Sequence, residues 1–204
     1  MNRTFSAALG LLASFALAAL PTLAQDSKAP AQTQSAPETA PETAPEPDVP
    51  GVEHAFLAKR AGTYTTTTKF RASPDAEPEV STGAATITSI LDGRFIAEDN
   101  SGSMGDYPFS GHRVMGFNNK SQRFEATWYY SNSTAVLVLV GESTNLGKTI
   151  ELRGSFEGAP GQMFPINARI RHFDADRFVV EMLSNAPDGS SYVMLETTYK
   201  RTED

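Results

Sequence analysis

Residues 121–142 constrain the fold most, because they hold the only tryptophan and the longest apolar run outside the N-terminus. Apolar and more polar side chains alternate over residues 123–130, the two-residue period of a strand with one buried face. Turn-forming residues follow at 131–134, so the chain is expected to reverse and return as a second strand over 135–142. Residues 136–140 are all apolar, which predicts cover on both faces of that strand. We therefore expect a central hairpin in a curved antiparallel sheet.

The first 24 residues have the layout of a secretory signal peptide. Arg3 precedes an apolar run over residues 5–20, and small residues lead up to Ala24. A membrane anchor is the alternative, but the run is shorter than the roughly 20 residues that a spanning helix needs. We expect cleavage after Ala24, export to the periplasm of a Gram-negative bacterium or secretion, and no integral membrane segment in the mature chain.

Residues 25–50 differ in composition from the rest of the chain. They consist largely of Ala, Pro, Thr and Glu, with the repeated motif A-P-E-T. Such a tract has almost nothing to bury and cannot offset the entropy of ordering, so we predict a disordered linker. A recognition motif for a proline-binding partner is the alternative. The remaining residues, 51–204, are predicted to form one domain.

Charge and cysteine content exclude several classes of function. The net charge is −7 and no basic stripe occurs, so we expect no nucleic-acid partner. The chain has no cysteine, which removes disulfides, thiolate metal sites, cysteine nucleophiles and a lipoprotein cleavage site. The composition gives no indication of oligomeric state.

One helix and about ten strands are predicted after the linker. The helix spans residues 51–61, with Val52, Ala55, Phe56 and Lys59 on one face, and Gly62 ends it. Its expected role is to plug one end of a barrel. Ten strands with short turns favour a single closed antiparallel β-barrel over a sandwich. They are predicted at 63–71, 80–91, 94–101, 109–117, 122–131, 135–144, 148–156, 164–173, 177–184 and 191–201.

Several short motifs occur in a characteristic order and spacing. They are L-A-K-R-A-G-T-Y at 57–64, L-D-G-R-F at 91–95, Y-P-F-S-G at 107–111, M-G-F-N-N at 115–119, T-W-Y at 127–129, S-T at 133–134 and V-M-L-E-T-T-Y-K-R at 193–201. Together they resemble the bacterial family named domain of unknown function 1579 over residues 52–202. Tyr64 departs from the tryptophan usual in that family. The resemblance implies an all-β, calycin-like barrel, related in shape to lipocalins and fatty-acid-binding proteins, without an assigned activity.

The inward-facing residues of such a barrel are the candidate binding site. Barrels of about eight strands are just filled by their side chains, whereas about ten strands leave room for a guest. Apolar walls with a few hydroxyl groups suit a small hydrophobic or amphipathic molecule. The candidate ligand-binding residues are Tyr64, Thr66, Thr68, Phe124, Trp128, Tyr130, Phe164, Ile166, His172, Phe178 and Met182.

Metal and cofactor chemistry is not expected. The three histidines, His54, His112 and His172, are not at metal-ligand spacing from one another. His172 continues the apolar face of its strand, which places it at the barrel mouth. Haem contact there is an alternative, since some calycin-like barrels bind haem through one histidine, but a hydrogen bond to a neighbouring loop is the simpler interpretation.

We expect a non-catalytic binding module, because no G-x-S-x-G motif and no supported serine nucleophile occur. Two alternatives stay open. A hydrolase or isomerase acting within the barrel predicts a buried cluster of acid, base or histidine. A structural or interaction protein predicts a lumen filled with side chains. The arginine of the last strand, Arg201, is expected to stack on Tyr64 of the first and help close the barrel.

Overall fold

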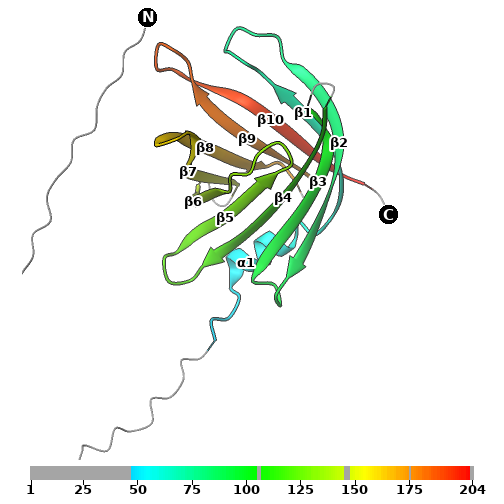
Figure 1. Cartoon of the computed structure of the whole chain (residues 1–204). Helices are drawn as coiled ribbons and strands as arrows, with labels where there is room; N and C mark the ends of the chain where they lie inside the picture. The colour runs from blue at the N-terminus through cyan, green and yellow to red at the C-terminus, as the bar shows by residue number, and fades with distance from the viewer. Residues whose placement is uncertain (1–46, 105–106, 145–147, 175, 203–204) are drawn as a thin grey trace, which may run out of the picture. The chain divides into compact units, whose positions relative to one another are not determined.

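The computed structural model describes residues 47–104, 107–144, 148–174 and 176–202. In these residues the chain forms one helix and ten strands (Figure 1). The predicted signal peptide and nearly all of the predicted linker lie outside the described residues. The elements are α1 Val52–Ala58, β1 Gly62–Phe70, β2 Glu79–Ile90, β3 Phe95–Met104, β4 Tyr107–Asn118, β5 Arg123–Tyr130, β6 Leu137–Thr144, β7 Thr149–Ala159, β8 Gln162–His172, β9 Arg177–Asn185 and β10 Ser191–Arg201.

The strands form one closed antiparallel barrel in which each strand pairs with its sequence neighbours. This confirms the predicted fold class, and the predicted strands differ from the observed ones only at their ends. β1 and β10 close the barrel, with Tyr64 opposite Arg201 in the register. The Arg201 guanidinium lies 4.9 Å from the centre of the Tyr64 ring. The predicted stacking across the closing seam is therefore confirmed.

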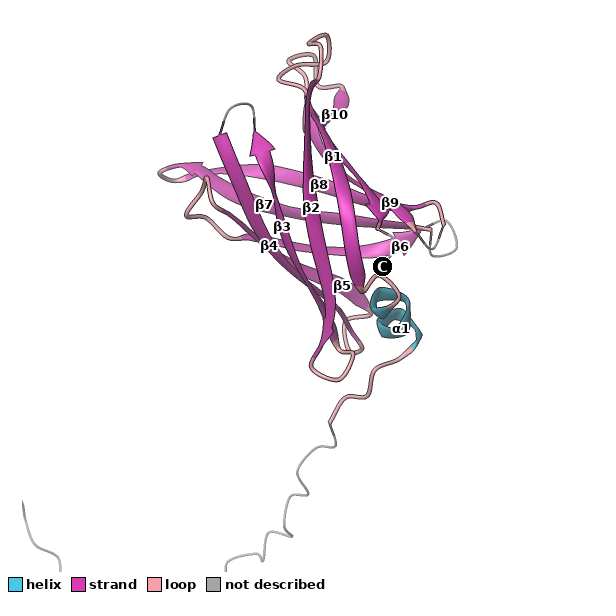
Figure 2. Ribbon diagram, turned by 90° about the vertical axis from the view of Figure 1, so that its right-hand side faces the viewer, coloured by secondary structure: helices cyan, strands magenta, loops and turns pink. Residues whose placement is uncertain are grey.

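α1 plugs one end of the barrel, which we call the closed end (Figure 2). The helix contacts β2, β3 and β4. It buries His54 and Leu57, while Val52 is exposed, so the predicted buried face of α1 is wrong. A seven-residue helix buries only one position per turn, and a pattern this short does not fix which one. His54 Nδ1 accepts a hydrogen bond from the Gly51 N–H at 2.9 Å, which secures the start of the helix.

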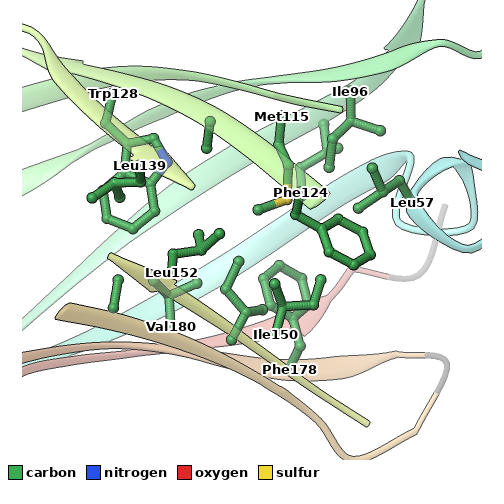
Figure 3. Packing of buried hydrophobic residues seen from close by; sticks show 14 of the residues in the cluster. Leu57, Ile96, Met115, Phe124, Trp128, Leu139, Ile150, Leu152, Phe178 and Val180 are labelled. Carbon is green, nitrogen blue, oxygen red and sulfur yellow. The ribbon is translucent and has the colours of Figure 1, made fainter. Parts of the chain in front are cut away.

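The half of the lumen next to α1 is filled with apolar side chains (Figure 3). Leu139, Ile150 and Leu152 are fully buried there, and Trp128 is only 1% exposed. Side chains from strands on opposite sides of the barrel meet in this region, with no layer of helices between them. It forms the hydrophobic core of the domain.

The apolar run in β6 has only one buried face. Leu137 and Leu139 point into the lumen, whereas Val136 and Val138 are 49% and 56% exposed. The expectation that both faces of residues 136–140 are covered is therefore wrong. A single closed sheet has one interior, and alternate residues of every strand face outward.

Within the described ranges, no helix has the length and apolar character needed to cross a membrane.

Candidate functional site

The other half of the lumen contains a cavity of about 730 Å³. All ten strands contribute to its lining, and it reaches the end of the barrel opposite α1, which we call the open end. Glu79 and Val80 of β2 lie on its rim and are exposed. The volume is in the range that small-molecule sites usually have. The cavity is the candidate functional site of this domain.

One side of the cavity is apolar. It is formed by β6 to β9, which contribute Leu137, Phe156, Phe164, Ile166 and Met182. The rings of Phe156 and Phe164 stack with their centres 5.7 Å apart. Phe156, Phe164 and Ile166 are alternate or facing positions of β7 and β8, as expected for the lumen face of a barrel. This side can pack against a hydrocarbon chain or an aromatic ring.

The opposite side of the cavity carries most of its hydroxyl and amide groups, beside apolar residues such as Phe70 and Leu195. β1 and β10 contribute Thr66, Thr68 and Thr197, and the Thr68 and Thr197 hydroxyls are hydrogen-bonded at 3.0 Å. β3 contributes Asn100 and Ser101. These groups offer both donors and acceptors to a guest. The cavity is thus amphipathic across its width.

A charged cluster lies at the base of the cavity. Arg113 and Tyr199 line the cavity, and Glu98 lies against both of them. Tyr199 donates its hydroxyl hydrogen to Glu98 Oε1 at 2.8 Å and accepts a hydrogen bond from Arg113 Nη1 at 3.0 Å. Asn100 Nδ2 donates to the same carboxylate oxygen at 3.1 Å, and Arg113 Nη1 lies 3.6 Å from it. Glu98 and Arg113 are directly paired in the β3–β4 register.

The ionisation of this cluster follows from its burial. Burial is the largest single influence and disfavours the charged form of Arg113, but Glu98, Tyr199 and Tyr130 together outweigh it, so the pKa of Arg113 lies above its ordinary value. Burial also raises the pKa of Tyr199 and the pKa of Tyr130. The guanidinium therefore stays charged, and both phenols stay neutral at ordinary pH. The base of the cavity presents a cation beside two hydroxyl groups.

Arg113 also separates the cavity from the packed half of the lumen. Its guanidinium lies 4.9 Å from the centre of the Trp128 ring, a cation–π contact. Trp128 does not line the cavity, yet it touches a residue that does. We therefore expect the emission of this single tryptophan to respond to a guest at the cavity base.

The predicted site residues fall into two groups. Six of them line the cavity together, and the other five do not. The lining residues are Thr66, Thr68, Tyr130, Phe164, Ile166 and Met182. Tyr64, Phe124, Trp128 and Phe178 belong to the packed core. His172 lies at the closed end, at the end of β8.

His172 is engaged by the residues around α1. Its Nε2 is hydrogen-bonded to Arg60 Nη2, and its ring packs against Phe56 and Phe178 at 4.8 Å and 5.9 Å between centres. Burial and the positive charge of Arg60 lower the pKa of His172 to about 3. Because His172 does not line the cavity, a haem bound in the cavity could not take His172 as its iron ligand. Among the described residues there is also no group of three or more His, Cys, Asp or Glu that could hold a metal.

Sequence reasoning missed the charged base of the cavity. Glu98 shares the lumen face of β3 with Ile96, and Arg113 shares that of β4 with Met115. The signal is that the inward-facing series of each of two consecutive strands contains one charged residue. Opposite signs at such positions predict a buried ion pair, since neither charge is tolerated alone.

Comparison with known proteins agrees with this architecture. Rv2717c from M. tuberculosis is similar in structure, with a TM-score of 0.56 and 14% identity over 75% of this chain and 99% of that one. The S-type phycobiliprotein lyase CPES from Guillardia theta is similar at a TM-score of 0.54 and 14% identity, covering 76% of this chain and 99% of that one. At this identity the likeness concerns the fold alone.

No curated protein matches the chain in sequence. Residues 49–201, nearly the whole described barrel, match the family described as protein of unknown function DUF1579. This is the family that the motifs from Leu57 to Arg201 resemble, and the closed barrel is the fold that the resemblance implies. The chain therefore belongs to the DUF1579 family.

Proposed function

We propose that the protein is exported and binds a small amphipathic molecule in the cavity at the open end. One observation carries this proposal: a cavity of about 730 Å³ has an apolar side formed by β6 to β9 and a polar side formed by β1, β3 and β10. A guest with a hydrocarbon part and a polar head would satisfy both sides. Burial of its apolar surface would supply the affinity, at roughly 25 cal/mol per Å² before the costs of association.

Binding is favoured over the two alternatives. A purely structural barrel predicts a filled lumen, and the cavity counts against it. Catalysis would need an acid or base presented to the guest. Glu98 is the buried acid nearest to the cavity, but its Oε1 is engaged by Tyr199, Asn100 and Arg113, and Glu98 itself does not line the cavity. The cluster is better suited to recognition than to proton transfer.

The binding proposal is tested by filling the cavity. Ile166→Trp places a bulky ring into the lumen, whereas Val138→Trp adds the same ring to the exposed outer face and serves as the matched control. Protein purified from its own host is examined by native mass spectrometry for a bound molecule. Calorimetric titration with fatty alcohols, fatty acids and retinoids then measures affinity.

At least one probe class should bind saturably to the wild type and to Val138→Trp, and at least tenfold more weakly to Ile166→Trp, a loss of about 1.4 kcal/mol or more. If no molecule co-purifies and no class binds, the binding proposal is wrong. Export is tested separately by N-terminal sequencing of the mature protein. We expect Gln25 as the first residue, and an intact Met1 would contradict export.

A further inference from the structure

The charge at the base of the cavity is balanced by the protein itself. Among the described residues that line the cavity, Arg113 is the only cationic one. Its partner Glu98 lies on the adjacent strand, 7% exposed, and the Arg113 side chain is 12% exposed. The two groups form an ion pair at 3.6 Å. A guest that reaches the cavity base therefore meets a pair with no net charge.

This balance affects charged and uncharged head groups differently. A guest carboxylate placed against Arg113 would lie beside Glu98, and two carboxylates in one poorly solvated site repel each other. The guest would also lose its hydration without gaining an unpaired cation. An uncharged hydroxyl, amide or carbonyl needs only donors and acceptors, which Arg113, Tyr130 and Tyr199 provide at the same place.

Glu98 is also held too firmly for a guest carboxylate to displace it. Tyr199 and Asn100 donate hydrogen bonds to Glu98 Oε1 at 2.8 Å and 3.1 Å, in addition to the contact with Arg113. Taking Arg113 away from Glu98 would leave a buried carboxylate without its counter-ion, which is strongly unfavourable. At the rim, Glu79 adds a further negative charge on the path of an anionic guest.

We propose that Glu98 sets the ligand specificity of the cavity by neutralising Arg113, so that the site selects amphipathic molecules with an uncharged polar head over their carboxylates. Glu98 is a specificity-determining residue that acts through Arg113 rather than by touching the guest. This inference rests on the proposed binding function and narrows it to one chemical class of ligand.

The test compares decanol, decanamide and decanoate, which share one chain length and differ in the head group. Calorimetry at neutral pH, where decanoate is ionised, gives the three affinities for the wild type and for Glu98→Gln. We expect the wild type to bind decanol and decanamide at least tenfold more tightly than decanoate, in line with about 1.4 kcal/mol per factor of ten. Glu98→Gln keeps the side-chain shape and frees the charge of Arg113, so decanoate should gain at least tenfold while decanol changes little.

Glu181→Gln is the matched control, because Glu181 is also buried and is paired with Arg169 and Arg171 but faces away from the lumen. It should leave the preference between head groups unchanged. The double variant Glu98→Gln/Arg113→Gln removes both charges, so decanoate should gain nothing relative to decanol.

The outcomes separate the two proposals. Equal or tighter binding of decanoate by the wild type overturns the inference and leaves the binding function intact, and this comparison needs no variant. An unchanged preference in a folded Glu98→Gln also overturns it. If no decyl probe binds to any form, the inference is wrong, whereas the proposed function is wrong only if in addition no molecule co-purifies and no other probe class binds.

Discussion

The two halves of the lumen are built from the same ten strands, but one half is packed with side chains and the other contains a cavity. Near α1, the inward residues of β7, Ile150 and Leu152, are fully buried among apolar neighbours. Further along the same strand and on the same face, Phe156 lines a cavity. One strand thus contributes to a packed core at one end and to a binding wall at the other. The comparison separates the part of the barrel that stabilises the fold from the part that is available for a ligand.

The size of the inward side chains accounts for the difference. The closed half contains an aromatic cluster, in which the Phe178 ring stacks on Tyr199 at 4.2 Å and packs edge-on against Tyr64 at 5.4 Å. In the open half, the facing pairs Thr66 and Gly83, and Thr68 and Ser81, of β1 and β2 are small. Side chains this small do not reach across a barrel of ten strands, so the space remains unfilled.

The largest expected effect comes from truncating one leucine in each half. Leu152→Ala removes a fully buried side chain from the packed half and should lower the free energy of unfolding by about 3 to 5 kcal/mol. Leu137→Ala is the matched change at the cavity wall, where Leu137 already lacks neighbours on one side, and should cost about 1 to 2 kcal/mol. Urea unfolding of both variants gives the two values, and equal losses would contradict the division of the lumen.

The sequence predicts the fold better than the site, for a physical reason. Strand alternation and turn residues are local, so they predict ten strands, and the Tyr64 and Arg201 pair predicts the closing seam. Whether an inward residue packs or lines a cavity depends on what faces it across the barrel. Alternation places Trp128 and Phe164 alike on the lumen face, yet Trp128 is in the core and Phe164 lines the cavity. The distances between side chains on opposite sides of the barrel depend on strand register, and the two-residue period of one strand does not determine them.

A smaller effect concerns pH at the closed end, where His172 accepts a hydrogen bond from Arg60. The pKa of His172 is lowered from 6.5 to about 3, so the unfolded chain binds a proton between these values while the folded chain does not. Stability from this residue is therefore present above about pH 6.5 and is lost as the pH falls.

Between about pH 6.5 and about pH 5, the loss should be about 1 to 2 kcal/mol. His172→Gln keeps a hydrogen-bond acceptor without this titration, so its unfolding free energy should fall less over the same range. Chemical unfolding at several pH values measures both slopes. Parallel slopes for the wild type and the variant would show that the closed end does not depend on a neutral His172.

The smallest expected effect tests where the folded domain begins. Residues 25–46 lie outside the described part of the chain, and their composition predicts no stabilising contact with the barrel. The Asp48 and Val49 carbonyls, in contrast, accept hydrogen bonds from Arg94 at 3.0 Å and Asn119 at 2.9 Å in two turns at the closed end. Deleting residues 25–46 should therefore leave the thermal midpoint within about 2 °C of the wild type.

Deleting residues 25–50 removes two exposed hydrogen bonds and should cost up to about 1 kcal/mol, which is a few degrees in a domain of this size. Asp48 and Val49 contact turns at the closed end, away from the cavity mouth, so their removal should not change ligand affinity. A large drop on deleting residues 25–46 would mean that the linker packs on the closed end and belongs to the half of the molecule that stabilises the fold.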